Sequence, residues 1–396
     1  MSICRTVARR RMLRGKPTFI AGVVALCLLS ASCSSANTSR SGASTPTKDS
    51  STPASMAKAQ ANVDALSKAP TYRGPTEPVD LSKVRGKTIY FVAFDLSNAF
   101  NKSILDNFTE AAAVMGVKVV ALNGQVNSAL ESTYVDQAVK ANAAAIMLLS
   151  VGAEQVPASL QNAAAAHIPV ITMAQRTAGG DPGKNITNQA TVNTTDVGKA
   201  QVDLAYVMSK GNINAVGYGG NSLPQDVSQW DGQAARIKEL CPDTCKYDNK
   251  NINLTSFQTQ LPTIARAAIT ADKNLNWFLP TWDILAGYVA PGIKQAGADG
   301  RVQYSSWNGI PAAVQSVSDG TEAATIGVPL RWWGWAAADM AARYIAGQTV
   351  APDAENLPVR LFTKATIEQA GSTSDETKLY GDSAVFDTYK KLWGVS

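Results

Sequence analysis

Histidine is nearly absent from this sequence, since His167 is the only one in 396 residues. Histidine is the commonest side chain for general base catalysis and for metal binding, so both kinds of site lack their usual residue. The G-x-S-x-G, H-E-x-x-H and G-x-x-x-x-G-K-[ST] patterns of hydrolases, metalloproteases and P-loop proteins are also missing. His167 itself lies between an alanine-rich helical pattern and an apolar strand pattern. We therefore expect no enzyme, no cofactor and no metal site.

Cysteine is also scarce, with five in the chain. Cys4 and Cys27 fall in a basic and then apolar N-terminal segment, and Cys33 follows directly after it. Cys241 and Cys245 remain as an even pair in CPDTC. Two free thiols or half of a metal site are the alternatives, but in an exported protein a short-loop disulfide is favoured.

The N-terminus has the features of an export signal. Six basic residues and no acid occur in residues 1–16, and residues 17–29 form an uncharged apolar run. That run is shorter than the roughly twenty residues that a membrane-spanning helix needs, although a single N-terminal anchor is the alternative. We expect a signal peptide over residues 1–32, exported by the general or the twin-arginine route. Ser30-Ala31-Ser32 before Cys33 resembles a bacterial lipobox, which implies lipidation of Cys33 and anchoring to the outer face of the cell membrane.

Charge and composition change after this segment. Without residues 1–32 the chain has 30 basic and 31 acidic residues, a net charge of −1, so nucleic-acid binding has no basic surface to support it. Residues 34–55 are rich in Ser, Thr, Ala and Pro and contain too few apolar side chains to fold. We expect a lipidated Cys33 and a flexible tether over residues 33–85, with a short helix near 56–67 and an extended segment over 69–80.

From Gly86 onwards, strand and helix patterns alternate in two similar rounds. Apolar strand patterns occur at 89–94, 117–123, 145–150 and 168–175, and then at 213–220, 252–257, 277–281, 302–308 and 323–329. Helical patterns separate them, the later ones being near 196–209, 230–240, 264, 285–293 and 340. This alternation predicts an α/β fold of two doubly wound lobes with parallel sheets. Ligands of such sheets bind outside the carboxyl ends of the strands, so we expect a site between the lobes.

The order of IYFVAFDLSNAF, IPVITM, NTTDVGKA, QWDGQ, WD, WNG and AATIGVP resembles the periplasmic sugar-binding proteins of the ribose-binding type. The resemblance implies a three-segment hinge between an N-terminal lobe (86–194 plus 329–360) and a C-terminal lobe (195–328 plus 361–396). It implies a monomeric lipoprotein that binds a small molecule and delivers it to the permease of an ABC importer. A lipoprotein receptor of the same fold that senses a ligand for a membrane signalling protein remains the alternative.

The same resemblance places the ligand site at the strand ends. The family often has an Asp-Arg pair where this chain has Ala174-Gln175, Arg where it has Gln229, and Asp where it has Asn308. Charged groups are thus replaced by amides, while aromatic residues gather at the same positions. Some of the tryptophans have core or interlobe packing as their alternative role. The pattern favours a neutral ligand, such as a sugar or polyol, held by Phe94, Asn98, Phe100, Gln175, Gln229, Trp230, Trp282, Asp283, Trp307 and Asn308.

Overall fold

The structure, a computed structural model, describes residues 53–381 and 383–395. The expected signal peptide 1–32, Cys33 and the first part of the expected tether lie outside these residues. Within the described ranges, no helix combines the length and apolarity needed to cross a bilayer.

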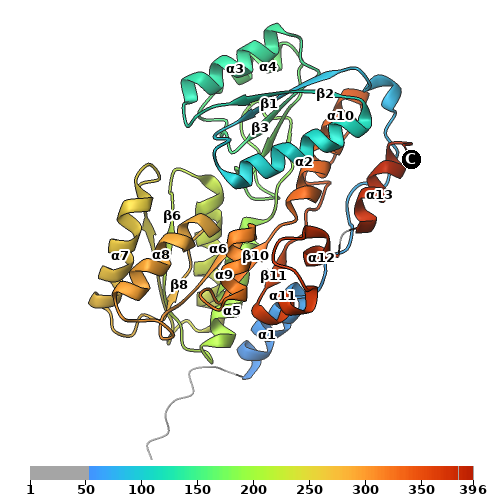
Figure 1. The fold of residues 1–396 in the computed structure, drawn as a ribbon. Coiled ribbons are helices and arrows are strands. Elements are labelled where there is room, and N and C mark those ends of the chain that lie inside the picture. Colours follow the sequence, from blue (N-terminus) through green and yellow to red (C-terminus); the bar gives the residue numbers. More distant parts are fainter. Residues whose placement is uncertain (1–52, 382, 396) are drawn as a thin grey trace, which may run out of the picture. The chain divides into compact units, whose positions relative to one another are not determined.

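The first sheet has five parallel strands in the order β2-β1-β3-β4-β5. All five residues of β3 are buried, as expected for a strand covered on both faces. Helices α3 and α4 pack together on one side of the sheet, and α2 packs against α10 on the other (Figure 1). These elements are β1 (Thr88–Ala93), α2 (Ala99–Met115), β2 (Lys118–Asn123), α3 (Ser128–Lys140), β3 (Ala145–Leu149), α4 (Pro157–Ala165), β4 (Val170–Met173), β5 (Asn188–Gln189) and α10 (Leu330–Ala346).

The second sheet has six strands in the order β11-β10-β9-β8-β6-β7. All pairs are parallel except β10 with β11, which is antiparallel. Helix α5 packs against α6, and α7 packs against α8. These elements are α5 (Thr194–Met208), β6 (Asn214–Gly219), α6 (Pro224–Leu240), β7 (Lys246–Asn251), α7 (Phe257–Ala271), β8 (Trp277–Phe278), α8 (Asp283–Gln295), β9 (Gln303–Asn308), α9 (Pro311–Ser318), β10 (Ala324–Gly327) and β11 (Arg360–Phe362).

Helices α5 and α6 approach each other unusually closely, and two glycines permit it. A Cβ atom on Gly198 would lie 2.1 Å from the carbonyl oxygen of Gln229, and one on Gly232 would lie 2.0 Å from that of Thr195. Any larger residue at either position would push the helices apart. This contact fixes α6, whose first turns stand at the carboxyl end of the second sheet.

The chain passes between the sheets three times, after β5, after β10 and again before β11. Two sheets, parallel except for the pairing of β10 with β11, are joined by three crossing segments and confirm the predicted fold class of two doubly wound lobes. The residues after β11 contribute to both lobes. Helix α11 (Lys364–Ala370) packs against α9 and β11 and contacts α12 (Glu376–Tyr380), whereas α13 (Ser383–Leu392) packs against α10.

One strand prediction is wrong. Residues 252–257 were expected to form a strand, but the strand is the preceding segment β7, and 252–256 form a turn that leads into α7. β7 has the sequence KYDNKN and is largely exposed at the edge of its sheet, so no apolar pattern marks it. Ile252 and Leu254 instead pack beneath the turn, in the core cluster of the second sheet.

The expected flexible tether does not extend to residue 85. Residues 53–85, here called the N-terminal strap, begin with α1 (Pro53–Leu66), whose Ala59 and Val63 are buried against α5 and α6. Asn62 also donates a hydrogen bond to the carboxylate of Asp203, 3.0 Å away on α5. Buried apolar side chains stabilise this segment enough to offset its ordering entropy, which the composition of residues 34–55 alone could not do.

The second half of the strap runs to the other sheet. The ring of Tyr72 stacks on Trp332 of α10, with centroids 6.0 Å apart. The backbone N–H of Val79 donates to the carbonyl of Leu392 at 2.8 Å, and the 3₁₀ turn Leu81–Lys83 packs on α10. The strap therefore joins helices of the second sheet to helices of the first.

Candidate ligand-binding site

Three predicted site residues follow β1. Phe94 is partly buried, and its backbone N–H donates to the carbonyl of Leu149 at 2.9 Å. Asn98 caps α2, with its side-chain oxygen accepting from the N–H of Phe100 at 2.9 Å. Phe100 is buried and packs edge-to-face on Trp333 of α10, with ring centroids 5.7 Å apart. Phe94 and Asn98 thus keep surface at the strand end, while the Phe100 ring lies in the core.

Gln175 follows β4 and is buried. Its backbone carbonyl accepts a hydrogen bond from the N–H of Gln225, in the first turn of α6, at 3.1 Å. The loop after a strand of the first sheet therefore contacts a helix start of the second. This contact brings the carboxyl ends of the two sheets together, as the predicted site requires.

Gln229 and Trp230 of α6 are both buried. The amide of Gln229 donates to the side-chain oxygen of Gln201 at 2.8 Å, and the amide of Gln233 donates to the same oxygen at 2.6 Å. The amide of Gln201 in turn donates to the carbonyls of Pro280 and Ser305, 3.1 and 3.0 Å away. This chain of amides joins α5 and α6 to the segment after β8 and to the middle of β9, so the amide of Gln229 is already hydrogen-bonded within the protein.

Asp283, Trp307 and Asn308 lie around the ends of β9 and β10. The buried carboxylate of Asp283 accepts from Thr325 Oγ1 at 2.7 Å and from the N–H of Ile310 at 2.8 Å, and burial raises its pKa. Trp307 is only 2% exposed and belongs to the core. Asn308 is partly exposed and has a φ angle of 130°, a backbone conformation that residues other than glycine rarely adopt.

Trp282, the residue before α8 and four positions after the end of β8, is partly exposed. Its indole N–H donates to Oδ1 of Asp226 at 2.8 Å, and its ring meets that of Phe257 nearly edge-on, with centroids 6.4 Å apart. Of the ten predicted residues, four keep exposed surface at the strand ends, namely Phe94, Asn98, Trp282 and Asn308. The other six are buried: Phe100, Gln175, Gln229, Trp230, Asp283 and Trp307.

Asp226 and Phe257 could not be singled out from the sequence. Asp226 is fully buried one turn before Gln229 in α6, and Phe257 starts α7. Both touch Trp282 although they are 56 and 25 positions away along the chain. An aspartate following Leu223-Pro224-Gln225 reads as an ordinary acidic residue in the first turn of a helix, so no local signal reveals its partner.

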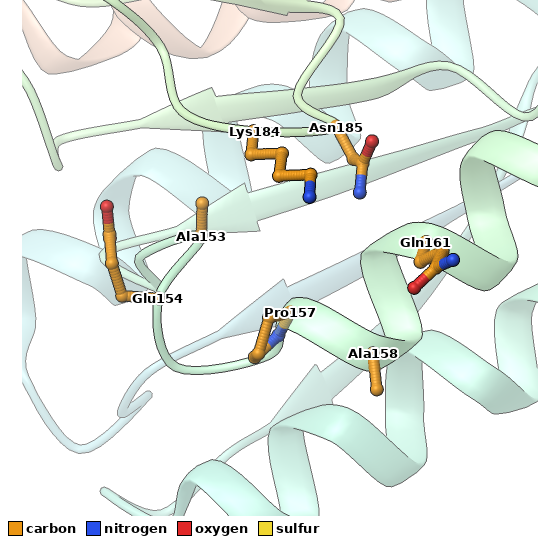
Figure 2. Close-up of a pocket in the computed structure, with 7 residues that line it drawn as sticks. All are labelled: Ala153, Glu154, Pro157, Ala158, Gln161, Lys184 and Asn185. Atoms are coloured by element: carbon orange, nitrogen blue, oxygen red, sulfur yellow. The ribbon is translucent and has the colours of Figure 1, made fainter.

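A hollow of about 370 Å³ lies between the start of α4 and the loop after β4. Figure 2 shows Lys184 and Asn185 on the loop facing Pro157, Ala158 and Gln161 of α4. It contains none of the ten predicted residues. Within residues 53–381 and 383–395, no group of three or more His, Cys, Asp or Glu side chains could hold a metal ion.

Cys241 and Cys245 are joined by a disulfide, with Cα atoms 5.4 Å apart. The bridge closes the turn between α6 and β7. Cys241 is buried, whereas Cys245 is partly exposed.

Solved structures of several binding proteins resemble this one. An ABC sugar transporter subunit from Rhodobacter sphaeroides is 19% identical, with a TM-score of 0.64, over 71% of this chain and 99% of the other. A solute-binding protein from Agrobacterium vitis with bound allitol is 17% identical, with a TM-score of 0.65, over 72% and 98%. A 5-methylthioribose transporter solute-binding protein from Thermotoga lettingae is 17% identical, with a TM-score of 0.65, over 77% and 96%.

No curated protein sequence matches the chain significantly. The family description "Periplasmic binding protein domain" matches residues 89–349, which contain both sheets except β11. The match to a family of binding proteins supports the expectation that the chain is not an enzyme. The match and the two-sheet architecture together show that this chain belongs to the periplasmic binding protein family and has its type I fold.

Proposed function

We propose that the protein captures one neutral, hydroxylated small molecule, such as a sugar or polyol, between the carboxyl ends of its two sheets. The contact between Gln175 and Gln225 is the observation that carries this proposal, because it brings the two strand ends to one place. Ligands of doubly wound sheets bind at such ends.

The side chains at these ends favour a neutral ligand. Phe94, Asn98, Trp282 and Asn308 offer aromatic surface and amide groups. Arg176, the nearest cationic residue after β4, is paired with Glu154. An aromatic face and an amide suit the apolar ring face and the hydroxyls of a sugar better than a charged amino acid.

Related structures support the same class of ligand. Their bound molecules include allitol, D-allose and myo-inositol, all of them neutral polyhydroxylated compounds. We propose that this chain likewise works outside the cytoplasm as a monomer and passes its ligand to the permease of an ABC importer. Its anchor is a lipid on Cys33, after removal of residues 1–32.

A thermal-shift screen tests the proposal directly. Purified protein is heated with sugars, polyols, neutral aromatic compounds and charged amino acids, and hits are titrated by calorimetry. A ligand that binds only the folded state raises the melting temperature by mass action. We expect stabilisation by a neutral hydroxylated compound with one site per chain. Stabilisation by charged amino acids alone would contradict the proposed ligand class.

A further inference from the structure

Asp226 gathers three hydrogen-bond donors from the carboxyl end of the second sheet. Its Oδ2 accepts from the N–H of Gly220, after β6, at 2.8 Å and from Oγ1 of Thr281, after β8, at 2.9 Å. Its Oδ1 accepts from the indole N–H of Trp282 at 2.8 Å. One fully buried carboxylate thus fixes the relative positions of α6 and the ends of two strands.

The side chain of Trp282 has a single polar group, the indole N–H, and this group donates its hydrogen bond to Asp226. Phe257 packs against the same ring at an interplanar angle of 75°, and Tyr288 packs in turn against Phe257 with centroids 5.4 Å apart. The ring is therefore held on its polar side and supported by a second aromatic ring. The part of Trp282 that remains exposed can offer a ligand only apolar ring surface.

We infer that Asp226 is a positioning residue that fixes Trp282 as an apolar stacking surface, and that the ligand presents a flat or apolar face to it. This inference rests on the proposed function, and it narrows the ligand class. A compound with hydroxyls on every face would place one of them against the Trp282 ring. The ring offers no full hydrogen bond in exchange for the water that this hydroxyl loses, so binding would be weaker. A sugar or polyol with one apolar face or substituent fits the surface better.

The positioning of Trp282 should depend on whether Asp226 is protonated. Burial raises its pKa to about 6, although the three hydrogen bonds oppose this shift. The groups that face the carboxylate are the Gly220 N–H, the Thr281 hydroxyl and the Trp282 indole, and none of these titrates near neutral pH. Protonation removes the negative charge that strengthens the hydrogen bond from the Trp282 indole, so the positioning of Trp282 weakens below about pH 6.

Ionisation of Asp226 has opposite effects on the stability of the fold and on the positioning of Trp282. The folded pKa of Asp226 lies above the ordinary value of 3.8, so ionisation of this group disfavours the fold as pH rises from 3.8 to about 6. In the folded protein this ionisation is centred near pH 6, and it strengthens the hydrogen bond from Trp282. Ionisation of Asp226 should therefore strengthen ligand binding although it weakens the fold, and a purely structural residue would show no such opposition.

The first test needs no ligand. The indole ¹⁵N–¹H resonance of Trp282, assigned with the variant W282F, is followed by NMR from pH 4.5 to 8. We expect it to titrate with a midpoint near 6, and to lose this titration in D226N. D272N is the control, because Asp272 is a partly exposed aspartate that likewise accepts hydrogen bonds, from the side chain of Asn214 and the N–H of Asn274, but none from Trp282. A Trp282 resonance that does not titrate in the wild-type protein overturns the inference, even if D226N fails to fold.

The second test measures binding of 5-methylthioribose and of allitol by calorimetry at pH 5 and pH 7.5. We expect tighter binding of 5-methylthioribose, which carries an apolar substituent, and a decrease in its affinity of about tenfold in D226N but not in D272N. Equal affinities for the two probes, or an unchanged affinity in D226N, overturn the inference about the stacking surface. If neither probe binds and the thermal-shift screen finds no sugar or polyol that binds, the proposed ligand class fails, while the resonance of Trp282 still decides whether Asp226 positions it.

Discussion

Replacing Tyr72 with alanine removes the ring by which the N-terminal strap holds α10 and α13 together. Tyr72 stacks on Trp332 with centroids 6.0 Å apart and meets Tyr389 edge-on at 5.4 Å. Loss of a fully buried aromatic side chain costs about 3–5 kcal/mol, and each aromatic pair adds roughly 0.5–1.5 kcal/mol to simple burial. Because Tyr72 is only partly buried, we expect Y72A to lower the free energy of unfolding by about 2–4 kcal/mol.

Urea denaturation followed by tryptophan fluorescence measures this loss. Y72F is the matched control, since it keeps the ring and removes only the hydroxyl that donates to the carbonyl of Pro75 at 2.7 Å. That single hydrogen bond is worth about 0.5–1.5 kcal/mol. If Y72A costs no more than Y72F, the strap does not pack on α10 as described, and residues 67–80 belong to the flexible tether after all.

Three further predictions concern other parts of the chain. Burial without any partner in the described chain raises the pKa of Glu131 to about 7 from 4.5, so the wild-type protein should lose about 2–3 kcal/mol of stability as pH rises from 4.5 past 7. E131Q should lack this decline in denaturation curves taken at pH 5 and pH 8, and an identical decline in both proteins would refute the assignment. W282A and N308A should each weaken ligand binding by about 1–3 kcal/mol in calorimetry, and full affinity in both would remove these residues from the site. C33A should move the protein from the membrane fraction to the soluble exported fraction, whereas retention after an alkaline wash would contradict lipidation of Cys33.

The inner strands of the two sheets could be predicted from the sequence because they are buried on both faces and leave continuous apolar runs. Residues 145–150 show this clearly, since every residue of β3 is buried. β7 escaped detection for the opposite reason: its KYDNKN sequence lies exposed at a sheet edge, where burial imposes no pattern. Edge strands are often polar because charge discourages pairing with other chains.

The direction of individual side chains could not be predicted in the same way. Strand order placed Phe100 and Gln229 near the site. The ring of Phe100 instead packs on Trp333 in the core, and the amide of Gln229 donates to Gln201. Such partners come from helices far away in the sequence. Asp226 was missed because its role depends on Trp282, which only the folded chain brings within 2.8 Å.

The N-terminal strap affects where this chain can be cut. The family match starts at residue 89, so a protein shortened to that limit would lack α1, Tyr72 and Val79. Apolar surface of α5, α6 and Trp332 would then face water, and the hydrogen bond from Val79 to Leu392 that secures α13 would be lost. Exposed apolar patches of this kind promote aggregation. For recombinant work, the smallest soluble unit of this protein should therefore begin near Pro53 and continue through Trp393.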